Sequence, residues 1–204
     1  GSLINGLIES GTAPREIAVA DPVATQLEKF SALGVSAAAS NDSAVEDADV
    51  VVLAVKPQVT GQVLTQLSGL KPHQLIISIV AGIDLRSLEA WLPEKQPIVR
   101  CMPNTPALLG AGMTGLFANK QVSHSQKDSA THILSAVGEV AWVTKETHLD
   151  AVTALSGSGP AYFFLLMENM ILAGQKLGLD AELSKKLTQQ TAFGAALMAQ
   201  NNDI

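Results

Sequence analysis

The 204-residue sequence has little of what several classes of protein require. A single cysteine, Cys101, excludes a disulfide framework and a cysteine-rich zinc site. Asp and Glu number 19 against 13 Lys and Arg, and this acidic balance excludes general binding to a nucleic-acid backbone. No apolar run reaches the roughly 18 residues that span a bilayer, and no secretory leader is visible. We therefore expect a soluble, cytoplasmic protein of enzyme size.

The familiar arrangements of catalytic side chains are lacking too. No paired carboxylates, no Ser-His-Asp order and no cluster with metal-ligand spacing stands out, so we expect no metal site. Four histidines lie apart and are interpreted as surface residues: His73, His124, His132 and His148. Cys101 falls within an expected strand and is interpreted as a small buried hydrophobe. Any chemistry is then carried by a cofactor.

Apolar residues are abundant, at 47%, and their pattern predicts the fold. The unbroken apolar run at 50–55 is typical of a parallel strand buried on both faces. Helical segments separate the strands, which predicts βαβ units and a mostly parallel, Rossmann-like sheet. Strands are expected at 17–20, 35–39, 50–55, 75–80, 98–102, 114–118 and 140–143.

The pattern changes near residue 145, after which only helices are expected, at 148–155, 160–177 and 181–200. The predicted domains are a dinucleotide-binding domain at 1–145 and an all-α domain at 146–204. The stretch 161–173 is apolar nearly all round, which is typical of a fully buried helix. We expect it to pack against a second subunit; an ordinary intradomain core is the alternative.

Asp21 follows the first expected strand. In a dinucleotide-binding sheet, an acidic residue about 20 positions beyond the glycine-rich turn binds the adenine ribose. Counting back places that turn, and the first strand, before Gly1. Asp21 also suits the N-cap of a helix that Pro22 opens, and both interpretations stay open.

Three later strands end in segments suited to a ligand, because in open parallel sheets the ligand crevice lies at the carboxyl ends. Lys56 follows one strand and could meet a phosphate or ribose, or remain a solvated lysine. Ala81 and Gly82 follow the next and let a flat dinucleotide approach. After the third strand, two prolines bracket Asn104 and its neighbour and fix the backbone there. The fixed backbone either directs the two polar side chains toward a ligand or simply forms a rigid turn.

The segment Ser156-Gly157-Ser158-Gly159-Pro160 precedes the most apolar helix. Proline suits the first helical position, and the glycines free the backbone before it. Exposed N–H groups and hydroxyls at a helix N-terminus form a site for a small carboxylate. The alternative is a flexible joint between domains.

These segments together resemble the pyrroline-5-carboxylate reductase family, the last enzymes of proline synthesis. The resemblance spans essentially the whole chain and rests on AVKP at 54–57, SIVAG at 78–82, RCMPNTP at 100–106 and DAVTALSGSGPAY at 150–162. It implies a Rossmann domain followed by a helical domain that dimerises through interlocking helices, with dimers that can build larger rings.

The resemblance also implies the reaction, in which NADPH or NADH gives hydride to the C=N carbon of 1-pyrroline-5-carboxylate and forms L-proline. It assigns no catalytic side chain. The residues that it places beside the cofactor are Asp21, Asn41, Val55, Lys56 and Ala81, and the strand-end position of Asn104 places that residue beside the cofactor as well. Those that it places beside the substrate are Ser156, Gly157, Ser158, Gly159 and Asp203. Asn104 is expected where nicotinamide and substrate meet.

The sequence departs from the family pattern at both ends. The family's glycine-rich fingerprint would precede Gly1, and its Ser-Pro-Gly-Gly-Thr loop would follow Ile204. Asp203 stands where the family has a glutamate. The segment by itself is therefore expected to bind cofactor poorly. Asp21 favours NADH because it repels a 2′-phosphate, whereas Asn41 tolerates one, so both cofactors stay open.

Two other functions remain as alternatives. A dehydrogenase of the β-hydroxyacid or arogenate type would need a Lys or His on the first long helix of the helical domain, and that helix offers only Lys176, near its far end. A non-catalytic binding protein on an enzyme-like dimer scaffold would fit the missing ends.

Overall fold

The computed structural model describes residues 1–201, which form two compact units, one ending at Gly157 and the other beginning at Ser158. Each unit is described by itself. The predicted division into domains 1–145 and 146–204 stays a prediction.

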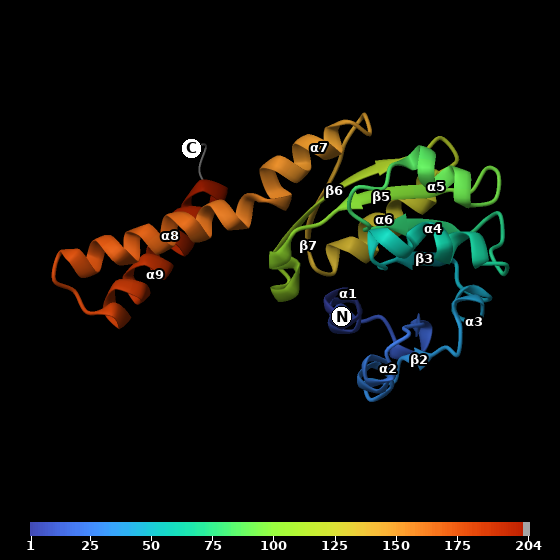
Figure 1. Ribbon diagram of the computed structural model, residues 1–204, viewed down its shortest axis with the longest axis horizontal. Coiled ribbons are helices and arrows are strands. Elements are labelled where there is room, and N and C mark those ends of the chain that lie inside the picture. Colours follow the sequence, from blue (N-terminus) through green and yellow to red (C-terminus); the bar gives the residue numbers. More distant parts are fainter. Residues whose placement is uncertain (202–204) are drawn as a thin grey trace. The chain divides into compact units, whose positions relative to one another are not determined.

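A five-stranded sheet forms the centre of the first unit (Figure 1). Its strands lie side by side in chain order: β3 (Val50–Leu53), β4 (Leu75–Ser78), β5 (Ile98–Met102), β6 (Gly112–Ala118) and β7 (Gly138–Trp142). All neighbouring pairs are parallel except β5 and β6. That pair is antiparallel because a short connection, η2 (Thr105–Leu109), joins the strands without a crossover helix. The predicted mostly parallel sheet is confirmed.

Two apolar clusters cover the two faces of this sheet. Because successive strand residues point to opposite faces, Ile76 belongs to one cluster and Ile77 to the other. The first cluster includes residues of α4 (Pro57–Gln66) and α5 (Leu85–Trp91), and the second includes residues of α6 (His124–Ser135). Helices on both faces explain why the strands are continuous apolar runs.

A second, two-stranded parallel sheet precedes the main one. It consists of β1 (Ala18–Val19) and β2 (Ser36–Ala37), joined by α2 (Ala24–Ser31). The first helix, α1 (Ser2–Glu9), contacts α6 and η2, and α3 (Asn41–Val45) contacts β1. A 3₁₀ turn, η1 (Pro14–Glu16), leads into β1.

The prediction that Asp21 caps a helix opened by Pro22 is wrong. The helix α2 begins at Ala24, and Val23 is its N-cap. Asp21 Oδ1 instead accepts a hydrogen bond of 2.8 Å from the Val23 N–H. A side chain that bonds the backbone two residues on stabilises a turn, so the helix starts later than the proline suggests.

The second unit contains two helices, α8 (Gly159–Lys176) and α9 (Ala181–Asn201), which pack against each other. Gly178, at φ +98°, ends α8 in the left-handed conformation that favours glycine. The apolar side chains of α8 are mostly exposed in the single chain, including Phe163 and Phe164. Two helices cannot bury these side chains between themselves, so a further surface is needed to cover them.

Candidate active site

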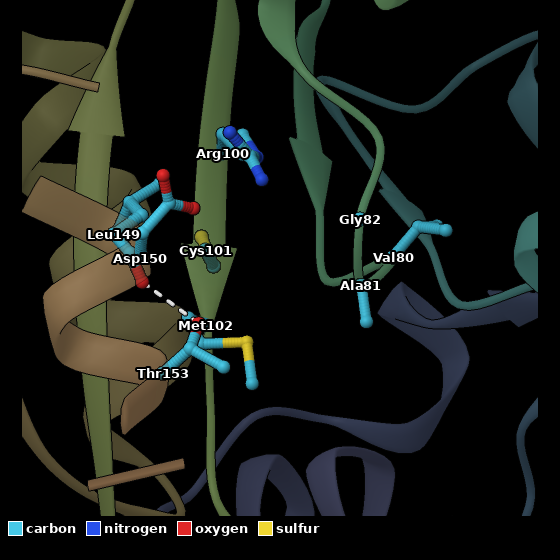
Figure 2. A pocket seen from close by; sticks show the side chains of 9 residues that line it. All are labelled: Val80, Ala81, Gly82, Arg100, Cys101, Met102, Leu149, Asp150 and Thr153. Carbon is cyan, nitrogen blue, oxygen red and sulfur yellow. Dashed lines mark hydrogen bonds between the residues drawn. The ribbon is translucent and has the colours of Figure 1, made fainter. Parts of the chain in front are cut away.

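A cavity of about 220 Å³ lies at the carboxyl ends of β4 and β5. Figure 2 shows Val80, Ala81 and Gly82 on one side of it and Leu149, Asp150 and Thr153 on the other, with β5 between them. The last three belong to α7 (His148–Val152) and to η3 (Thr153–Gly157), a π-helical turn that continues it. This is the edge of the sheet where the sequence predicted a ligand crevice.

A second, larger cavity of about 450 Å³ adjoins the end of β5 on the side of α1. Met102 lines both cavities, and Asn104 and Gly157 line the second. The walls combine apolar side chains with few polar groups, which is typical of small-molecule sites.

An ion pair ties three elements together beside the first cavity. Arg100 Nη1 lies 2.8 Å from Glu146 Oε1, with side chains 13% and 28% exposed. The same carboxylate oxygen accepts a 2.7 Å hydrogen bond from the Leu85 N–H at the start of α5. The pair therefore joins β5, α5 and the approach to α7, and it neutralises a charge in the cavity wall.

Two titratable groups, Asp84 and Cys101, have shifted pKa values. Hydrogen bonds from Ser87, at the start of α5, hold the pKa of the Asp84 carboxyl below its usual value. Burial raises the pKa of the Cys101 thiol, whose residue is 2% exposed. A thiol with a raised pKa is a poor nucleophile, so the interpretation of Cys101 as a buried hydrophobe is confirmed.

The residues predicted to bind cofactor follow the strand ends as expected, although they do not all share one cavity. Ala81 lines the first cavity and Asn104 the second. Four others line neither: Asp21, Asn41, Val55 and Lys56. Lys56 is exposed and is the N-cap of α4.

The predicted helix start is confirmed, because α8 begins at Gly159 with Ser158 as its N-cap and Pro160 in its first turn. The segment before it is not an open loop, since the π-helical turn η3 extends to Gly157. The Ser156 hydroxyl donates to the Val152 carbonyl at 3.1 Å. Ser158 and Gly159 begin the second unit, and Asp203 lies outside the described residues.

The pairing of Arg100 with Glu146 was not predicted. A charged residue inside an otherwise apolar strand was a visible signal for Arg100. No local signal indicated Glu146, which lies 46 positions further along the chain. The four histidines are exposed, as predicted.

Within residues 1–201, no group of three or more His, Cys, Asp or Glu side chains is placed to hold a metal ion. Over the same residues, no helix is long and apolar enough to cross a membrane.

Comparison with known proteins identifies the family. A model described as pyrroline-5-carboxylate reductase dimerisation matches residues 146–204, and one described as NADP oxidoreductase coenzyme F420-dependent matches residues 1–82. The pyrroline-5-carboxylate reductase of Pseudomonas aeruginosa is 54% identical over 205 residues, which cover the whole chain and 75% of that protein. The Haemophilus influenzae reductase is 44% identical over 98% of the chain and 74% of its own length.

The chain belongs to the pyrroline-5-carboxylate reductase family. The solved reductase structure from Coxiella burnetii covers the whole chain and 76% of its own, with 42% identity and a TM-score of 0.95. The Plasmodium falciparum structure, described as having NADP bound, is 32% identical with a TM-score of 0.87 and covers the whole chain and 75% of its own.

Membership of this family confirms the predicted fold class, a Rossmann-like sheet followed by a helical dimerisation region. The dimerisation match covers α8 and α9, and the exposed apolar side chains of α8 lie within it. The Mycobacterium tuberculosis 3-hydroxyisobutyrate dehydrogenase is only 18% identical, at a TM-score of 0.63 over 88% of the chain and 62% of its own. That likeness extends to the fold alone and gives no support to a β-hydroxyacid substrate.

Proposed function

We propose that this reductase converts 1-pyrroline-5-carboxylate to L-proline with hydride from NAD(P)H. The observation that carries the proposal is the 54% identity to the Pseudomonas aeruginosa reductase along the whole chain. The first cavity supports it, because it lies at the edge of the sheet where dinucleotide-binding folds hold their ligands.

The residues present fit a nicotinamide cofactor. Gly82 has φ +74° and open space where a Cβ would stand, so a flat ligand can reach the backbone beside Ala81. We propose that Ala81 and Asn104 border the nicotinamide half of the cofactor. Asp21 and Asn41 would lie by the adenosine ribose, with Val55 and Lys56 along the groove between.

The bound cofactor supplies the hydride. A protonated imine is already electrophilic, so the protein has mainly to orient the partners and keep water away. The apolar side chains of Val80, Met102 and Leu149 do the second task at the cavity. Arg100 is paired with Glu146, which neutralises the guanidinium charge in the wall of the cavity.

We propose that Ser156, Gly157, Ser158 and Gly159 border the substrate carboxylate and that Asp203 lies near the same group. We also propose that the dimers assemble into a larger ring and that the enzyme acts in the cytoplasm. The statements on Asp203 and on the ring rest on the resemblance to the family.

The test is an absorbance assay of the intact protein with NADPH or NADH. We expect loss of the reduced cofactor that depends on added 1-pyrroline-5-carboxylate. A parallel assay with oxidised cofactor and 3-hydroxyisobutyrate tests the dehydrogenase alternative, and no turnover is expected there. Turnover of the hydroxyacid without turnover of the imine would contradict the proposal.

A further inference from the structure

The side chain of Asn104 makes two hydrogen bonds that point to a second role. Asn104 Oδ1 accepts from the Met113 N–H on β6 at 2.8 Å. Its Nδ2 donates to the Ser156 carbonyl at 3.1 Å. One amide therefore links the end of β5 with β6 and with η3, and all three lie in the first unit.

The Ser156 carbonyl needs this donor because of the proline four residues later. In an α-helix the carbonyl of Ser156 would accept from the N–H of residue 160, but Pro160 has none, and its ring clashes with that carbonyl. In a π-helix the donor would be Ala161, whose N–H donates to the Ser158 carbonyl at 3.0 Å. The Ser156 carbonyl therefore receives a hydrogen bond neither from residue 160 nor from residue 161.

The turn also packs closely on the strand that carries Asn104. A Cβ added at Gly157 would come 2.8 Å from Met102 Cε, so glycine allows η3 to approach the end of β5. Met102 lines both cavities, and Gly157 lines the second. A shift of η3 would therefore change the walls of the proposed site.

We propose that Asn104 is a positioning residue, whose amide replaces the helical donor that Pro160 removes and so fixes η3 against β5. This inference rests on the proposed function, because the fixed turn contains Ser156 and Gly157, which are proposed to border the substrate. π-helical turns are frequent at functional sites.

The chain offers a matched control at the opposite end of β5. Asn119 Oδ1 accepts from the Ile98 N–H at 3.1 Å, and its Nδ2 donates to the Gln96 carbonyl at 3.0 Å. Asn119 thus makes the same two kinds of bond at the amino end of the strand, away from both cavities, and it also accepts from the Gln121 N–H at 3.2 Å and donates to Glu89 Oε1 at 3.1 Å.

The experiment compares Asn104→Asp with Asn119→Asp in the intact protein. Asparagine and aspartate have the same shape, but the carboxylate cannot donate to a carbonyl. We expect Asn104→Asp to raise KM for 1-pyrroline-5-carboxylate by about tenfold, as expected for one lost hydrogen bond. Hydrogen exchange should rise at the amides of 153–157. Asn119→Asp should leave KM for the imine unchanged.

A double-mutant cycle tests the mechanism itself, with Asn104→Ala used in case the aspartate variant does not fold. Pro160→Ala restores an N–H that can reach Ser156, so Asn104→Ala should increase exchange at 153–157 less in the Pro160→Ala background than alone. Additive effects would overturn the inference, as would unchanged exchange in both Asn104 variants. An effect of Asn104→Asp confined to KM for NAD(P)H, or an equal rise in KM for the imine in Asn119→Asp, would overturn it too.

The cycle uses hydrogen exchange and needs no turnover. If the wild-type protein did not reduce the imine, the proposed function would fail. The coupling between Asn104 and Pro160 would still be decided by exchange.

Discussion

Replacing both Phe163 and Phe164 with lysine is expected to convert the homodimer into monomers. These side chains are 65% and 62% exposed in the single chain, on a helix within the matched dimerisation region. Truncating a central aromatic residue of an interface costs about 2–4 kcal/mol, and lysine adds a charge that resists burial. The two changes together should raise the dimer Kd by roughly a thousandfold or more.

Sedimentation velocity over a range of concentrations measures this change. Leu33→Lys is the matched control, because Leu33 is an exposed apolar residue, 46% exposed, in the first unit. It should leave the dimer intact. A double variant that sediments as the wild-type dimer at every concentration would show that α8 is not the covered surface.

Gly138→Ala is expected to lower the stability of the first unit by about 3–5 kcal/mol. Gly138 has φ +143°, which strains any residue with a Cβ. That Cβ would also lie 2.1 Å from the carbonyl oxygen of Gly112, its partner in the β6–β7 ladder. Backbone atoms cannot turn aside as a side chain can, so the two strands must separate at this point.

Thermal unfolding checks the prediction, with an expected fall in Tm on the order of 10 °C. Gly110→Ala is the control, because Gly110 has φ +69° but open space around the added Cβ. It should cost only about 1–2 kcal/mol, the penalty for a left-handed conformation. If Gly138→Ala and Gly110→Ala lost equal stability, the loss would come from the left-handed conformation alone, and crowding against Gly112 would contribute nothing.

The parts of the fold that were predictable are those set by local pattern. The continuous apolar runs at β3, β4 and β5 predicted buried parallel strands because both faces of the sheet are covered. The apolar helix at 161–173 predicted a second subunit, since nothing in a two-helix unit can bury it.

The errors arose where a side chain or a missing N–H redirects the backbone. Asp21 bonds the Val23 N–H and delays α2, which the helix-capping preference of aspartate and proline does not reveal. Pro160 suits a helix start, and a loop was therefore expected before it. Pro160 does lie in the first turn of α8, but the π-helical turn η3 precedes it, and the Asn104 side chain bonds the Ser156 carbonyl from 52 positions away. The Arg100–Glu146 pair is equally non-local.

The direct test of the central claim is to follow the hydride. The intact protein would be given 1-pyrroline-5-carboxylate and NAD(P)H with deuterium at the transferable position of the nicotinamide, and the proline formed would be examined by mass spectrometry and NMR. We expect L-proline with one deuterium on the former imine carbon. Proline without the label, or no proline, would contradict the assignment of this chain as a reductase that transfers hydride to the imine.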